Sequence, residues 1–167
     1  MNVFLSTPIS CFSDKEELKM YKKSIHSLIS RLKIRHKVCS EIEKIYDETD
    51  YDSPEKSIEK DLNAVKQCDL FIFHYPKKAP TSALIELGFA MSFNKNIIII
   101  TPCLNELPYL LQGIKAVFPD SQIIESASID NKTINQILLA IDSFEITWYK
   151  KTLQTKVLIL LSSVVFL

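Results

Sequence analysis

Short apolar runs alternate along the chain with longer segments in which apolar residues recur at helical spacing. Residues 3–5, 70–75 and 97–100 are largely apolar, and polar residues or prolines follow each run. This pattern predicts three buried strands. Residues 38–42 and 122–124 predict two weaker strands.

Helices are predicted between these strands. Ser13 and Glu16 form a capping-box pattern, and apolar residues then recur three or four positions apart through residue 32. Ser53-Pro54-Glu55 supplies a cap residue, a first-turn proline and an acid for the positive end of a second helix. The acidic stretch 46–53 before it is predicted as a surface loop. The remaining helical segments are 81–94, a broken helix over 104–115, and 131–144.

Strands that alternate with helices imply a parallel sheet with helices on both faces. Residues 97–100 are apolar throughout, as expected for a strand buried on both sides. We therefore predict an α/β, flavodoxin-like, doubly wound domain with strand order 2-1-3-4-5 over residues 1–146, followed by an apolar C-terminal tail over 147–167. In this order the binding crevice lies beyond the carboxyl ends of the first and third strands. The search for a site narrows to residues 6–9 and 75–86.

Composition excludes several functions for the 167 residues. Twenty basic and twenty acidic side chains give zero net charge, so we expect no nucleic-acid partner. Two glycines are too few for a Walker loop or a GxGxxG turn. The four cysteines are isolated, which predicts free thiols and no metal site. The start of the chain has no basic leader, and we expect a cytoplasmic protein.

Glu86 is the strongest candidate for chemistry. If Thr81 or Ser82 caps the third helix, Glu86 lies near the positive end of that helix, among apolar neighbours. A partly desolvated carboxylate aimed into the crevice suits a nucleophile, or a group that stabilises positive charge on a sugar. The alternative is structural, because Glu86 could cap its helix or pair with Lys77 or Lys78.

Three segments resemble the nucleoside 2-deoxyribosyltransferase family and the related Toll/interleukin-1 receptor (TIR) domains. They are Val3-Phe4-Leu5-Ser6-Thr7-Pro8-Ile9, Cys68-Asp69-Leu70-Phe71-Ile72, and Ser82-Ala83-Leu84-Ile85-Glu86-Leu87-Gly88-Phe89-Ala90 followed by Lys95-Asn96-Ile97-Ile98. In the transferases the Glu of a Glu-apolar-Gly-aromatic-Ala motif attacks the anomeric carbon. Enzymatic TIR domains use a Glu on the matching helix to cleave NAD. The resemblance implies that Glu86 is catalytic, and it implies an oligomer.

The chain also departs from the transferase pattern. That family has an acid in the loop before the catalytic helix, where this chain has Lys77-Lys78, and Ser82 replaces a Gly. The missing acid would protonate the departing base, whereas nicotinamide leaves NAD+ as a neutral base. Two lysines also suit a phosphate or pyrophosphate, although a solvated loop explains them equally well. We therefore predict NAD+ hydrolysis to nicotinamide and ADP-ribose, with NAD+ as substrate and no cofactor. The alternatives are deoxyribosyl transfer between bases and a non-enzymatic module that senses a nucleotide.

Other residues near the crevice have weaker claims. The candidates for substrate binding include Ser6, Thr7 and Pro8 in the first loop, and Ser82 before the third helix. The three hydroxyls could bind ribose or phosphate, but turn and cap roles also explain them. Tyr75 could stack on a ring, or it could pack in the core. The remaining candidates, for which structural roles are at least as plausible, are His74, Asp61 and Asp69.

The tail has the composition of an interfacial anchor. Trp148-Tyr149-Lys150-Lys151 precedes two apolar runs, 157–161 and 164–167, that only Ser162-Ser163 separates. From Val157 the run is shorter than the roughly 20 residues that span a bilayer. The alternatives are a truncated membrane helix, a tail that contacts a membrane, and a helix that packs in an oligomer or on its own domain.

Overall fold

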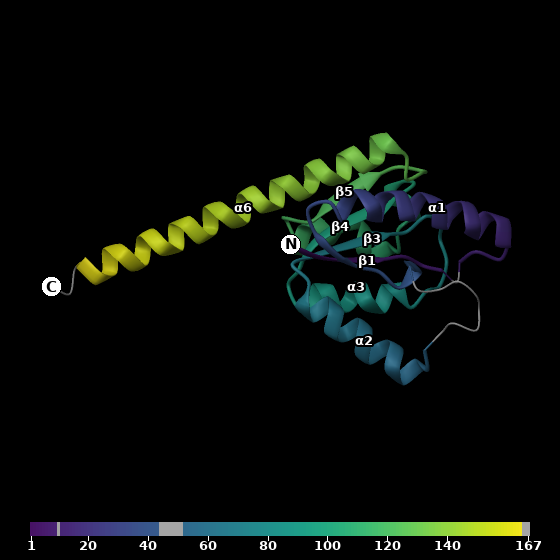
Figure 1. The fold of residues 1–167 in the computed structure, drawn as a ribbon, viewed down its shortest axis with the longest axis horizontal. Helices are drawn as coiled ribbons and strands as arrows, with labels where there is room; N and C mark the ends of the chain where they lie inside the picture. Colours follow the sequence, from purple (N-terminus) through teal and green to yellow (C-terminus); the bar gives the residue numbers. More distant parts are fainter. Residues whose placement is uncertain (10, 44–51, 165–167) are drawn as a thin grey trace.

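The computed structural model describes residues 1–9, 11–43 and 52–164, and these form one five-stranded sheet flanked by helices (Figure 1). All neighbouring strands pair in parallel, in the order β2-β1-β3-β4-β5. The predicted flavodoxin-like class and strand order are confirmed. The loop predicted over 46–53 lies outside the described residues except for 52 and 53. The strands are β1 (Asn2–Ser6), β2 (Lys37–Cys39), β3 (Leu70–His74), β4 (Asn96–Thr101) and β5 (Gln122–Glu125).

The helices lie in two layers. The helices α1 and α6 cover one face of the sheet, and α2 and α3 cover the other (Figure 1). The predicted broken helix is confirmed as three short turns, η3, α4 and α5. The bounds are α1 (Lys15–Leu32), η1 (Glu41–Glu43), α2 (Pro54–Gln67), α3 (Ala83–Ser92), η3 (Leu104–Glu106), α4 (Tyr109–Gln112), α5 (Ile114–Val117) and α6 (Asn131–Val164).

Local caps account for where the first helices begin. The side chain of Asp14, not Ser13, caps α1, because its Oδ1 accepts a hydrogen bond from the Glu16 amide at 2.8 Å. Ser53 caps α2 as predicted. At the start of α3, Ser82 forms no side-chain cap. Thr81 Oγ1 instead accepts a hydrogen bond from the Ala83 amide at 3.2 Å.

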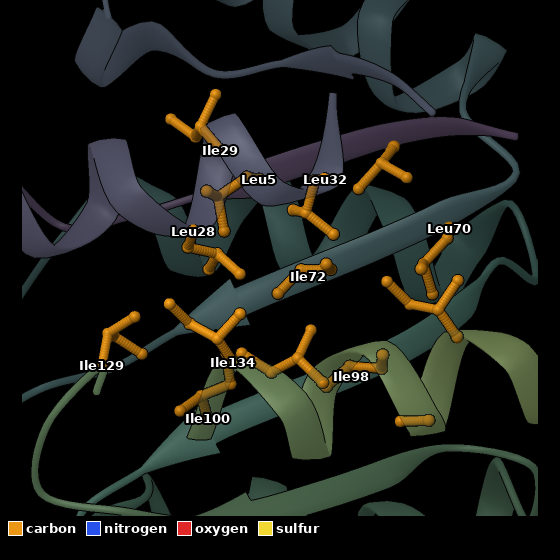
Figure 2. Close-up of a cluster of buried hydrophobic side chains, with 14 of the residues drawn as sticks. Leu5, Leu28, Ile29, Leu32, Leu70, Ile72, Ile98, Ile100, Ile129 and Ile134 are labelled. Atoms are coloured by element: carbon orange, nitrogen blue, oxygen red, sulfur yellow. The ribbon is translucent and has the colours of Figure 1, made fainter. Parts of the chain in front are cut away.

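Alternation along the central strands divides the core in two. On one face, side chains of β1, β3 and β4 pack against α1 and α6, as Figure 2 shows for Leu5, Ile72, Ile98 and their neighbours. On the other face, Phe4 stacks on Phe71 with ring centroids 5.5 Å apart, in contact with α2 and α3. The central strands are therefore buried on both faces, and polar side chains can gather only where these strands end.

The last helix differs from its prediction. It was expected to end at residue 144, before a separate tail, but α6 continues without a break to Val164. Core packing ends at Phe144, and Arg35 bonds Asp142 and Glu145 at 2.8 and 3.0 Å. The rest of α6 extends away from the sheet (Figure 1). Within the described ranges, no helix combines the length and hydropathy that crossing a membrane requires.

We expect replacement of Ile98 by Ala to lower the free energy of unfolding by about 3 kcal/mol, because the side chain is fully buried and truncation leaves a cavity. Ile34→Ala is the matched control, since Ile34 is 74% exposed, and it should change that free energy by less than about 0.5 kcal/mol. Urea denaturation measures both. Equal losses in the two variants would contradict the assignment of the core.

Candidate active site

The predicted site lies where the two central strands end. Ser6 and Phe73 are register partners at the carboxyl ends of β1 and β3, and both strands continue into loops at this edge of the sheet. The helix after β1 covers one face and the helix after β3 covers the other, so this edge is the topological switch point of the fold.

Glu86 lies in the first turn of α3 and is partly buried. Burial raises the pKa of its carboxyl group to about 7, and the negative charges of Asp61 and Glu41 act in the same direction, while the Ser6 hydroxyl opposes the shift. Glu86 forms no ion pair with Lys77 or Lys78 among the described contacts, because Lys77 pairs elsewhere and Lys78 is exposed. The capping and ion-pair alternatives for Glu86 therefore find no support here.

Ser6 faces Glu86 from the end of β1. Alternation places it on the same face as Phe4, toward α2 and α3, and it is 2% exposed. Within the described residues, its hydroxyl has no partner in ordinary hydrogen-bond geometry. Its contact with the Glu86 carboxyl is therefore looser than a full hydrogen bond, and this buried hydroxyl retains bonding capacity.

Two further acids lie near enough to act on Glu86. Asp61 comes from α2, and Glu41 comes from η1, directly after β2. The sequence favoured a surface role for Asp61 and gave no role to Glu41. Glu41 lay inside the strand predicted over 38–42, but β2 ends at Cys39, so Glu41 follows the carboxyl end of that strand. No acid lies between Tyr75 and Glu86 in the sequence, but these two carboxyl groups lie near Glu86 from other parts of the chain.

The opposite face of this edge holds a buried hydrogen-bonded chain. Tyr21 Oη lies 2.9 Å from His74 Nδ1, and the two rings stack with centroids 5.4 Å apart. Burial lowers the pKa of His74 to about 3 and raises that of Tyr21 well above its usual value, while a hydrogen bond from Thr7 opposes the Tyr21 shift. His74 is therefore neutral at pH 7, and its Nδ1 shares a hydrogen bond with the Tyr21 hydroxyl, which also bonds to Thr7. This arrangement favours the structural role for His74.

Lys77 joins the two loops of the site. Its Nζ lies 2.9 Å from both carboxylate oxygens of Glu17 in α1, and 4.6 Å from the centroid of the Phe12 ring. These contacts hold the loop after β3 against the loop after β1. Phosphate binding by Lys77 and Lys78 stays a prediction.

The remaining predicted residues differ in exposure. Tyr75 is 1% exposed, stacks on Phe73, and exchanges 3.0 Å hydrogen bonds with both the amide and the carbonyl of Ala79. This environment favours its packing role. Pro8 is buried and Ser82 is exposed, so only Ser82 of these three presents an accessible side chain. Asp69, directly before β3, accepts a hydrogen bond from the Asn2 amide at 2.7 Å. It lies at the amino ends of the strands, whereas Glu86 lies at their carboxyl ends.

No group of three His, Cys, Asp or Glu side chains in the described ranges is arranged to hold a metal ion. The four cysteines are free thiols, as predicted.

Comparison with known proteins shows a similarity in fold to an N-glycosidase. No protein-family model matches the chain, and no curated protein matches its sequence significantly. Among solved structures, the chain is similar to the CMP N-glycosidase BcmB of Clostridium botulinum, with a TM-score of 0.62 and 25% sequence identity. The match covers 83% of this chain and 99% of BcmB. The resemblance to N-glycosidases of the nucleoside 2-deoxyribosyltransferase-like fold is therefore supported, and the TIR-like resemblance stays a prediction.

The Glu86 carboxyl group should titrate near pH 7 in the folded protein, because burial and two neighbouring negative charges disfavour its ionised form. Replacing Asp61 by Asn removes one of these charges and should lower the pKa of Glu86. Carbon NMR of protein labelled at its glutamate carboxyl groups measures the titration, and E86Q identifies the signal. A Glu86 pKa near 4.5 would contradict the described environment.

His74 should make stability depend on pH. Its folded pKa, about 3, lies below the unfolded value of about 6.5, so the unfolded chain binds the proton more readily. Stability from this group is complete above pH 6.5 and falls as the pH decreases, by about 3 kcal/mol at pH 4. Urea denaturation at several pH values measures the slope. His74→Asn can still form a hydrogen bond with Tyr21 but cannot titrate. In this variant the free energy of unfolding should change less between pH 6.5 and 4 than in wild type. An unchanged slope would contradict a buried neutral His74.

Proposed function

We propose that the protein is a nucleotide N-glycosidase that hydrolyses the bond between the sugar C1′ and the base, with Glu86 acting at C1′. The observation that carries this proposal is a half-buried carboxyl group at the switch point of a fold that is similar, over 83% of the chain, to a CMP N-glycosidase. A carboxylate in a poorly solvated site stabilises the positive charge that develops on the sugar as the base departs.

The reaction needs a base to leave and a water molecule to replace it. When the C1′–N bond breaks, its electron pair goes to the base nitrogen. The Glu86 carboxylate stabilises the cationic C1′ or forms an ester with it. The water oxygen then bonds to C1′ and loses a proton, and where an ester has formed the bond between C1′ and the Glu86 oxygen breaks. The products are the free base and the sugar phosphate, and Glu86 is again a carboxylate.

A departing pyrimidine or purine needs a proton, and the acids beside Glu86 offer one. The negative charges of Asp61 and Glu41 disfavour the ionised form of Glu86, which places these two side chains close enough to act at the same site. Asp61 or Glu41 is therefore our candidate for the group that protonates or orients the base. This arrangement supports a nucleoside monophosphate as substrate, because the nicotinamide of NAD+ leaves without a proton. NAD+ hydrolysis stays the alternative prediction.

Replacing Glu86 by Gln should lower kcat for base release by at least about 100-fold, because the neutral amide cannot offset charge on the sugar. Chromatography after incubation with CMP, other nucleoside monophosphates, NAD+ and deoxynucleosides measures the released base. Glu59→Gln is the matched control, since Glu59 is an exposed glutamate of α2, and it should retain full activity. Circular dichroism checks that both variants fold.

The same substrate panel separates the alternatives. Nicotinamide release that depends on Glu86 would make NAD+ the substrate, and base exchange with an added acceptor would indicate deoxyribosyl transfer. If wild-type protein leaves every substrate intact, or if E86Q matches wild type, the proposal is wrong. Binding of a nucleotide without cleavage would then favour a sensing module.

A further inference from the structure

In the distal half of α6, the apolar side chains that the structure describes are exposed. Phe144 is the last α6 residue packed in the core, and beyond it Ile146, Tyr149 and Leu153 are 56%, 65% and 52% exposed. Their spacing of three and four residues places them along one side of the helix. Figure 1 shows this part of α6 extending well past the sheet. Large apolar side chains in such a position need a partner outside this domain.

The sequence that follows distinguishes between possible partners. Residues 157–161 are five consecutive apolar residues, and residues 157–167 contain no charge. An unbroken apolar run leaves no polar stripe at helical spacing, whereas a helix that pairs with one other helix needs only a narrow apolar seam. The composition therefore suits surroundings that are apolar on every side. Lipid meets this requirement better than a second copy of the helix.

The residues before the apolar run have the chemistry of a membrane interface. Trp148 and Tyr149 are aromatic residues with polar groups, and Lys150, Lys151 and Lys156 are the only charged residues between 146 and 164. Aromatic rings of this kind favour the headgroup layer, and lysines attract anionic phospholipids. We propose that residues 146–164 of α6 dock the protein on an anionic lipid surface.

The direction of α6 leaves the candidate active site accessible. Glu86 lies at the carboxyl ends of β1 and β3, whereas α6 extends past the end of the sheet where these strands begin (Figure 1). A membrane at the far end of α6 would therefore leave the site facing the aqueous phase. The docking proposal does not depend on the proposed N-glycosidase activity.

Flotation of the full chain with vesicles tests the proposal. Wild-type protein should float with vesicles of phosphatidylcholine that contain about one third phosphatidylglycerol, and much less with pure phosphatidylcholine. L153E/L160E should weaken binding by at least about 100-fold, since two leucines no longer enter lipid. K150Q/K151Q/K156Q should weaken binding to the anionic vesicles by about 100-fold at low salt, and added salt should reduce the wild-type binding.

The matched control places the same charges elsewhere. M20E/V117E introduces two glutamates at equally exposed apolar positions of the domain, 73% and 74% exposed, and should bind vesicles as wild type does. Circular dichroism confirms that each variant folds. Cleavage of a soluble nucleotide should be unchanged in L153E/L160E, so a failure of docking is distinguishable from a failure of the proposed function.

Two results would overturn the proposal. One is wild-type protein that stays with the aqueous fraction at every lipid composition. The other is an oligomer, measured by analytical ultracentrifugation without lipid, that L153E/L160E dissociates while neither protein floats with vesicles. The second result would show that the distal part of α6 pairs with another copy of this chain.

Discussion

The burial of β1 and β3 on both faces is the constraint on which the rest of the structure depends. Leu5 and Ile72 pack toward α1 and α6, while Phe4 and Phe71 pack toward α2 and α3, so neither strand can present a polar side chain along its length. Polar groups are tolerated only where the strands end. The same packing that stabilises the sheet therefore concentrates hydroxyls and carboxyls at one edge, around Ser6 and Glu86.

Burying Glu86 near other carboxyl groups costs free energy, because the ionised carboxylate is poorly solvated there. The same burial raises the pKa of the Glu86 carboxyl group, and the negative charges of Asp61 and Glu41, from separate elements, raise it further. A protein selected only for stability would replace such a group or pair it with a cation. Lys77, in the loop before α3, instead pairs with Glu17 of α1. Among the described residues no ion pair forms at Glu86, and a carboxyl group in this state suits stabilisation of a cationic sugar.

Most of the fold could be predicted from the sequence, because the periodicities of strands and helices are local patterns. The apolar run at 97–100 and the Ser53-Pro54 start of α2 both predict elements that the structure contains. The site was only partly predictable. Glu86 stood out by its position after the third strand, but the influence of Asp61 and Glu41 arises from segments far apart in the chain. Their proximity follows from sheet order and helix packing, which no local pattern encodes.

For α6, the sequence predicted a boundary near residue 146 that the structure does not contain. The change in composition after residue 146 suggested a boundary, yet the backbone has no reason to stop there, because no glycine or proline interrupts 131–164. What changes is the surroundings of the helix. Up to Phe144 one apolar stripe faces the sheet, whereas residues 157–161 are apolar without interruption in the sequence. Because α6 is continuous, it fixes the distance between the sheet edge that carries Glu86 and the far end of the helix.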